Sequence, residues 1–139
     1  MNVFLAPDIY VNASVAPGTF PDRVVERVLG QSRGKSVATE WVLSRVQSML
    51  TAMPSFRNEA VQGQLDRIRS LVKVVPDGSD FGPDAWEQAL VAGAKAANAR
   101  CIVTDHPDLL ALEASGGVDF LSSEAWLLDV TTPPPVPGK

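Results

Sequence analysis

Short apolar runs alternate along this chain with longer segments of helical spacing. A continuous apolar run of four or five residues that ends at a turn or a polar residue is typical of a buried strand. Such runs predict parallel strands at about residues 2–6, 73–76, 101–104 and 118–121.

The segments between these runs carry apolar residues at intervals of three and four, the period of an amphipathic helix. Thr19, Ser36, Asp105 and Ser122 stand where each could cap the N-terminus of the helix that follows. The predicted helices cover about residues 20–30, 37–53, 57–72, 83–98 and 106–115, with a last helix from Ser122 through Leu128.

This alternation predicts an α/β fold, a short parallel sheet with helices on both faces. Functional groups in such sheets gather at the carboxyl ends of the strands, which draws attention to Asp8, Thr104, Asp105 and His106. We expect one domain over residues 1–130 and a proline-rich, flexible tail over residues 131–139.

Composition excludes several classes of protein. The 139 residues are 45% hydrophobic and 20% charged, which is typical of a globular domain rather than a disordered chain. A single cysteine, Cys101, excludes a disulfide framework, and a single histidine, His106, excludes metal sites built on two imidazoles. No apolar run reaches the about 20 residues of a membrane span, and the N-terminus lacks a basic region typical of a signal peptide. We therefore expect a cytoplasmic protein with no membrane contact.

Charge is unevenly distributed along the chain. Residues 1–73 hold 9 Lys/Arg and 6 Asp/Glu, whereas residues 74–139 hold 3 Lys/Arg and 10 Asp/Glu. The acidic second half is typical of a solvated face or of a pocket that binds a cation. The arginines of the first half could contact a nucleic acid, but they form no dense basic cluster.

Several motifs together resemble the PIN domain family, and within it the VapC-like branch of bacterial toxin–antitoxin nucleases. The resemblance covers about residues 2–128 and rests on the order and spacing of the motifs. The motifs are NVFLAPDIYVNASVAPG near the start, VLSR at residues 42–45, ALVAGAKAANARCIVTDHPDLLAL at residues 89–112, and GVDFLSSEAW at residues 117–126. The resemblance implies a PIN-like three-layer sandwich.

PIN nucleases gather three or four acidic side chains that hold one or two Mg²⁺ or Mn²⁺ ions for phosphodiester cleavage, since these hard cations prefer carboxylate oxygens. In the ungapped alignment the first family acid falls on Ala6, and the family asparagine falls on Asp8. The second acid falls on Ala38 or, in another register, on Glu40.

The remaining family acids are displaced in the same way. The third acid falls on Gln88 with Glu87 beside it, and the fourth falls on His106 with Asp105 before it and Asp108 after it. A displacement of one residue matters, because it rotates a helical side chain by about 100° and moves a strand side chain to the other face. The candidate vestigial site comprises Asp8, Glu40, Glu87, Thr104, Asp105, His106 and Asp108.

Two functions follow from these residues. The first is a catalytically degenerate PIN-like protein that acts by binding RNA or a protein partner. It needs no cofactor, and any metal at Asp8, Glu87 and Asp105 would bind weakly. The alternative is an Mg²⁺- or Mn²⁺-dependent endoribonuclease with a rearranged acidic site. Ala6, in place of the first acid, favours the degenerate protein. The resemblance also implies an antitoxin-like partner and a homodimer as possible assemblies.

Overall fold

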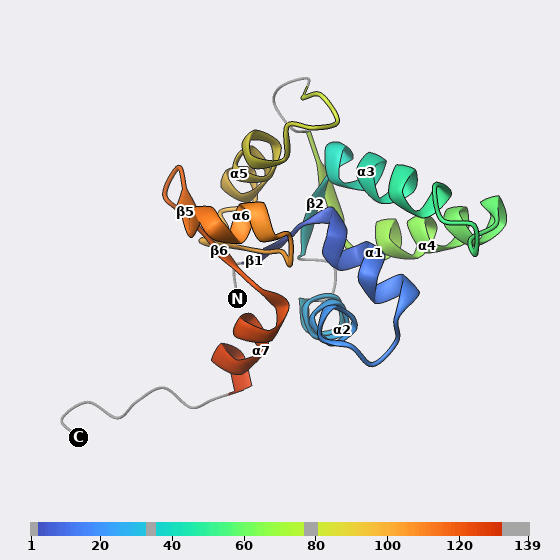
Figure 1. Ribbon diagram of the computed structural model, residues 1–139, viewed down its shortest axis with the longest axis horizontal. Helices are drawn as coiled ribbons and strands as arrows, with labels where there is room; N and C mark the ends of the chain where they lie inside the picture. Colours follow the sequence, from blue (N-terminus) through green and yellow to red (C-terminus); the bar gives the residue numbers. More distant parts are fainter. Residues whose placement is uncertain (1–2, 33–35, 77–80, 132–139) are drawn as a thin grey trace.

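The computed structural model describes residues 3–32, 36–76 and 81–131. Its elements alternate between short strands and helices, as the hydrophobic pattern predicts (Figure 1). In chain order they are β1 (Val3–Leu5), α1 (Pro7–Val15), α2 (Phe20–Ser32), β2 (Val37–Thr39), α3 (Glu40–Thr51), α4 (Asn58–Leu71), β3 (Lys73–Val75), α5 (Trp86–Ala96), β4 (Cys101–Val103), α6 (Pro107–Leu112), β5 (Ala114–Ser115), β6 (Val118–Leu121) and α7 (Ser123–Thr131).

A four-stranded sheet with the order β1-β4-β6-β5 forms the centre of the molecule. β1, β4 and β6 are parallel, and their register aligns Phe4, Ile102 and Phe120 in one row. β2 and β3 form a second, two-stranded parallel sheet, and β2 contacts β1. The four strands that the sequence predicts are therefore confirmed within the described residues, as β1, β3, β4 and β6.

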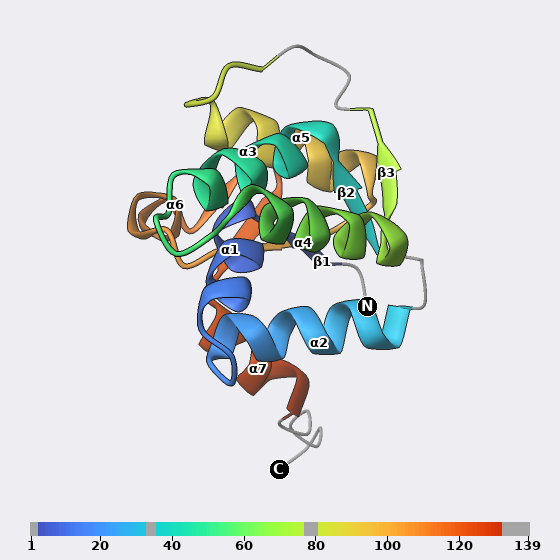
Figure 2. The same cartoon turned by 90° about the vertical axis from the view of Figure 1, so that its right-hand side faces the viewer.

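Helices cover both faces of this sheet. α5 packs on β1 and β4, whereas α2 and α7 contact each other on the opposite side (Figures 1 and 2). The close approach of α5 depends on Gly93, because a Cβ atom there would lie 2.5 Å from the Cζ atom of the Phe4 ring. Phe4 and Ile102 are fully buried, and they belong to a core that extends through α1, α3 and α4.

In the N-terminal half, the structure differs from the predicted helices in two places. Residues 7–15 form helix α1, for which no helix was predicted; its first residue is Pro7, whose fixed φ suits the first turn of a helix. The helix expected to begin after Ser36 is instead preceded by strand β2, and it begins at Glu40. Thr39 caps it by accepting a hydrogen bond from the backbone N–H of Val42 at 3.3 Å. β-branched Val37 and Thr39 favour the strand, and pairing with β3 stabilises it.

The remaining differences are at the ends of elements. The helix predicted over residues 106–115 ends at Leu112, and its last two residues form β5, which is antiparallel to β6. The short loop from Ser115 through Val118 explains this, because a tight turn can join only antiparallel strands. α7 runs through Thr131, one residue past the predicted domain boundary. The expected strand residue Asn2 and tail residues 132–139 lie outside the described residues.

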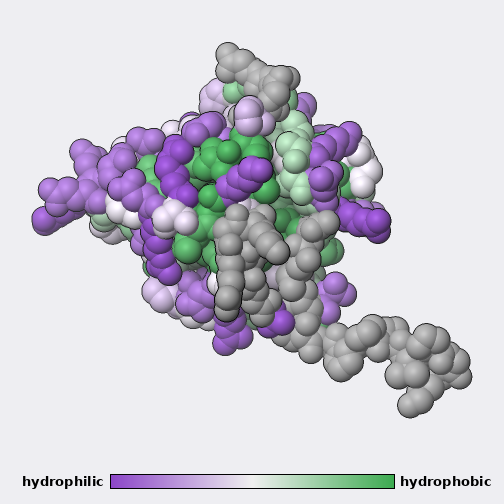
Figure 3. All heavy atoms as spheres, turned by 180° about the vertical axis from the view of Figure 1, so that it is seen from behind, coloured by the Kyte–Doolittle hydropathy of each residue, from purple (hydrophilic) through white to green (hydrophobic). Residues whose placement is uncertain are grey.

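The side of the molecule that bears β3 carries an apolar area. Val74 and Val75 are half-buried there, and among the described residues β3 pairs with one strand only, β2. Figure 3 views this side and shows hydrophobic residues at the centre with hydrophilic residues around them. Within the described segments, no helix is long and apolar enough to cross a membrane.

Candidate functional site

Asp8 and Thr104 meet at the carboxyl edge of the central sheet, as the parallel strands predict. Asp8 lies in the first turn of α1 just after β1, and Thr104 follows β4, the parallel neighbour of β1. The Thr104 hydroxyl donates a hydrogen bond to Asp8 Oδ1 at 2.8 Å, and the backbone N–H of Asp105 donates one to Oδ2 at 2.8 Å. Both carboxylate oxygens of Asp8 therefore accept hydrogen bonds from the β4–α6 connection.

Asp105 extends this network to the C-terminal helix. Its Oδ1 accepts a hydrogen bond from the backbone N–H of Ser123 at 2.8 Å, and its Oδ2 accepts one from the Ser123 hydroxyl at 2.7 Å. Ser123 is the first residue of α7, so the Asp105 carboxylate fixes the N-terminus of that helix to the sheet edge. An anion is also favoured there by the helix dipole.

The predicted capping role of Asp105 on α6 is wrong. The N-cap residue of α6 is His106, whose Nδ1 atom accepts a hydrogen bond from the backbone N–H of Asp108 at 3.2 Å. The backbone N–H of His106 itself donates to Thr104 Oγ1 at 3.1 Å. Pro107 occupies the first helical position, so the cap is one residue later than the sequence pattern indicates. The Asp105 side chain binds the first residue of α7 instead.

Burial controls the acidity of Asp8. Its side chain is only 8% exposed, and burial raises the pKa of the carboxyl group above its ordinary value of 3.8. The hydrogen bonds from the Asp105 backbone and the Thr104 hydroxyl oppose this shift, whereas the charge of Asp105 adds to it. Asp8 is thus a strongly desolvated acid beside a second acid.

Glu87 and Glu40 are engaged elsewhere. Glu87, in the first turn of α5, accepts a hydrogen bond from the hydroxyl of Ser115 on β5 at 2.7 Å. Glu40, 60% exposed, forms a two-pronged ion pair with Arg69 of α4, with N···O distances of 3.1 and 3.2 Å. This hydrogen bond from Arg69 lowers the pKa of the Glu40 carboxyl group.

The other aligned positions add no carboxylate to the Asp8–Asp105 pair. Ala6 and Ala38 are buried, at 0% and 1% exposure. Gln88 and Asp108 are exposed on α5 and α6. Of the seven candidate residues, the structure thus connects Asp8, Thr104, Asp105 and His106 through hydrogen bonds, and Asp108 joins them only through its backbone N–H.

These residues do not fit an Mg²⁺ or Mn²⁺ site of the kind that the resemblance implies. The described part of the chain contains no group of three or more His, Cys, Asp or Glu side chains that could hold a metal ion. Mg²⁺ takes six oxygen ligands in octahedral geometry, of which waters supply several and carboxylates one or two. Both oxygens of Asp8, and both of Asp105, already accept hydrogen bonds within the protein.

An aromatic row beside His106 was missed by sequence reasoning. The Trp41 and Trp86 rings meet edge to face with centroids 5.6 Å apart, and the His106 ring lies 5.6 Å from Trp86. The Trp41 Nε1–H donates to the carbonyl of Gly82 at 2.9 Å, which ties the segment before α5 to α3. The two tryptophans lie in different predicted helices far apart in sequence, and this separation concealed the contact.

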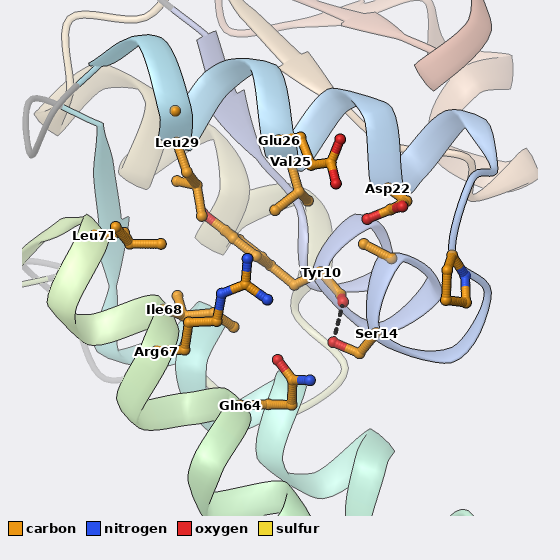
Figure 4. Close-up of a pocket in the computed structure, with 13 residues that line it drawn as sticks. Tyr10, Ser14, Asp22, Val25, Glu26, Leu29, Gln64, Arg67, Ile68 and Leu71 are labelled. Atoms are coloured by element: carbon orange, nitrogen blue, oxygen red, sulfur yellow. Dashed lines mark hydrogen bonds between the residues drawn. The ribbon is translucent and has the colours of Figure 1, made fainter.

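A cavity of about 430 Å³ lies between α1, α2 and α4 (Figure 4). Its apolar wall includes Tyr10, Val25, Leu29, Ile68 and Leu71. Its polar rim includes Asp22 and Glu26 on α2 and Gln64 and Arg67 on α4. The buried Tyr10 hydroxyl has no hydrogen-bond partner within the described segments. This α1–α2–α4 groove was also missed, because α1 itself was not predicted.

Comparisons with known proteins support the fold. No protein-family model and no curated protein matches this sequence. The structure is similar to a chain of VapBC2 from Rickettsia felis, whose crystal structure was determined with a DNA fragment from their promoter bound. The match has a TM-score of 0.61 and 16% sequence identity, and it covers 88% of this chain and 98% of that chain. At this identity the likeness concerns the fold alone: the chain has a PIN-like α/β fold, a short, mainly parallel sheet with helices on both faces.

Proposed function

We propose that this protein is a catalytically degenerate PIN-like domain that acts by binding a small antitoxin-like protein and does not cleave RNA. The observation that carries the proposal is that the carboxylates of Asp8 and Asp105, at the carboxyl edge of the sheet, accept hydrogen bonds within the protein. Asp8 binds the β4–α6 connection, and Asp105 binds the first residue of α7. Buried Ala6 contributes a methyl group where the resemblance places the first acid. These acids act as structural hydrogen-bond acceptors.

The α1–α2–α4 groove supports the binding part of the proposal. It combines an apolar wall with acidic side chains on one rim and Arg67 on the other. An amphipathic helix could bury its apolar face against Leu29 and Leu71 and place polar groups toward both rims. The fold neighbour is a VapBC2 structure, which is why an antitoxin-like protein is the partner that we propose.

A rearranged-site ribonuclease is the second candidate, and one observation favours it. Asp8 and Asp105 are adjacent at the carboxyl edge of β1 and β4, the edge where functional groups of parallel sheets gather. In this hypothesis Asp8 would have to exchange its internal hydrogen bonds for a metal ion.

A cleavage assay separates the two candidates. The unaltered protein is incubated with single-stranded and structured RNA in Mg²⁺ or Mn²⁺, with and without EDTA. We expect no EDTA-sensitive cleavage. Cleavage that Asp8→Asn or Asp105→Asn abolishes would establish the ribonuclease instead. A triple variant, Ala6→Asp with Gln88→Asp and His106→Asp, restores the aligned acids, and cleavage by this variant alone would support loss of an ancestral activity.

The binding part has its own test. Small antitoxin-like proteins are co-expressed with this chain, and complex formation is measured by size-exclusion chromatography and calorimetry. We expect a complex that Leu71→Asp, at the groove wall, weakens at least tenfold, while Leu112→Asp on α6 leaves it unchanged. Equal affinity of the three proteins would contradict the groove as the binding site, and absence of any complex would contradict this partner.

A further inference from the structure

A second groove lies between α2 and α7 and shares Glu26 and Gly30 of α2 with the first. Its volume is about 630 Å³, and its lining includes Phe20, Arg23 and Arg27 from α2 and Glu124, Leu127 and Leu128 from α7. Phe20 is 44% exposed and Leu128 is 58% exposed. The described residues contain four large hydrophobic side chains with such exposure, and two of them line this α2–α7 groove. Exposed apolar side chains gathered at one groove are typical of a binding surface.

The chain itself supplies a segment next to this groove. α7 ends at Thr131, and residues 132–139 have the sequence TPPPVPGK. Eight residues span up to about 25 Å at 3.1 Å per residue. Leu127 and Leu128 lie within one turn of the end of α7, or roughly 6 Å along the helix axis. The segment is therefore long enough to turn back from the end of α7 along Leu127 and Leu128.

The geometry points to residues 132–139 as the occupant of the α2–α7 groove of the same molecule. Four of the eight residues are prolines, and proline-rich segments bind apolar and aromatic grooves because their restricted backbones lose little entropy on binding. Phe20 and Leu128 provide the apolar surface for proline rings and Val136. This inference does not depend on the proposed partner groove, although Glu26 and Gly30 line both grooves.

Polar groups at the groove match the same segment. The buried Nε atom of Arg27 has no hydrogen-bond partner within the described ranges. The proposed docking would give this N–H an acceptor, because proline carbonyls have no internal partner in extended chains. Lys139 is the one charged side chain of the segment, and Glu26 and Glu124 at the groove offer it an opposite charge.

Nuclear magnetic resonance on the full chain tests this inference. In ¹⁵N-labelled protein we expect backbone order parameters of Val136 and Gly138 above about 0.6, the level below which a backbone is flexible. We also expect nuclear Overhauser contacts from the prolines to Phe20 and Leu128. Leu128→Ser should lower the order parameters of the segment, whereas Leu112→Ser, which alters a side chain 45% exposed on α6, should not.

Three outcomes would overturn it. Order parameters below about 0.6 in the unaltered protein mean that the segment is not docked. Insensitivity to Leu128→Ser means that it docks at another place. Contacts that appear only between differently labelled molecules mean that a second copy occupies the groove. Because both altered leucines are exposed, neither substitution removes a core side chain, and the fold is preserved for the comparison.

Discussion

Asp8 is a carboxylic acid held in the interior, and the energetics of its proton follow from that position. Burial raises its pKa in the folded protein above the ordinary value of 3.8 that applies to the unfolded chain. Between these two values the folded state keeps a proton that the unfolded state has lost. Stability should therefore fall as the pH rises through this window, and it should be constant with respect to Asp8 above the folded pKa.

Asp8→Asn tests this pH dependence. An asparagine can still accept from the Asp105 N–H and can donate to Thr104 Oγ1, but it cannot titrate. We expect the free energy of unfolding of the natural protein, relative to that of the variant, to decrease from pH 3.5 to pH 7 in urea titrations. A relative stability that increases with pH would mean that the hydrogen bonds outweigh burial and lower the pKa.

Gly93 is the residue at which the α5–sheet contact is most sensitive to one added methyl group. The Cβ of Gly93→Ala would lie 2.5 to 3.2 Å from three atoms of the Phe4 ring, which is fully buried. We expect a loss of about 2–3 kcal/mol in the free energy of unfolding, measured by urea denaturation.

Gly63→Ala in α4 is the matched control for this substitution. Nothing lies within 4 Å of its added Cβ, and alanine is the better helix former. This variant should be more stable than the natural protein by up to about 1 kcal/mol. Equal changes in both variants would show that the Phe4 contact is not what requires glycine at residue 93.

At the scale of elements, the turn between α6 and β5 stores backbone strain. Glu113 has φ 63° and ψ −45°, in a region that residues with a side chain rarely adopt. Its carbonyl accepts a hydrogen bond from the Phe120 N–H at 2.9 Å, so strand pairing holds the residue in place. Glu113→Gly should raise the free energy of unfolding by about 1 kcal/mol. Glu113→Ala keeps the strain and should give no such increase.

The elements show which parts of the fold the sequence can predict. Apolar runs identified β1, β3, β4 and β6 because a buried parallel strand is apolar on both faces. β2 and α1 were missed for different reasons. β2 spans three residues and merges with the helical pattern of α3, so its pairing with β3 decides its state. α1 is buried over residues 7–11, so it lacks the alternation of apolar and polar positions that marks an amphipathic helix.

The candidate site was predictable only in part. Asp8, Thr104 and Asp105 were found because parallel strands end at a common edge. The hydrogen-bond partners of the candidate acids were not predicted. Ser123, the partner of Asp105, is 18 residues away in sequence, and Arg69, the partner of Glu40, is 29 residues away. Sequence spacing describes which residues share an element, whereas these hydrogen bonds depend on how separate elements pack.

At the scale of the whole molecule, α2 lies between two grooves. Glu26 and Gly30 line both the α1–α2–α4 groove and the α2–α7 groove. Asp105 fixes the first residue of α7 to the sheet edge, so the far wall of the second groove is anchored through the same network that engages Asp8. The edge carboxylates thus position a surface helix, a role that a metal ion bound to them would compete with.

This competition predicts how stability responds to a divalent ion. With a dissociation constant of 1 mM or weaker, 1 mM Mn²⁺ stabilises the folded protein by at most about 0.4 kcal/mol, whereas a 10 µM site would add about 2.7 kcal/mol. For a chain of this size these values correspond to a rise in Tm of under about 2 °C and of about 10 °C. We expect the smaller shift in thermal unfolding with and without Mn²⁺, equal in the natural protein and in Asp8→Asn. A large shift in Tm that Asp8→Asn removes would mean that Asp8 exchanges its hydrogen bonds from Thr104 and Asp105 for the ion. The rearranged-site ribonuclease would then be the better explanation of the acids at this edge of the sheet.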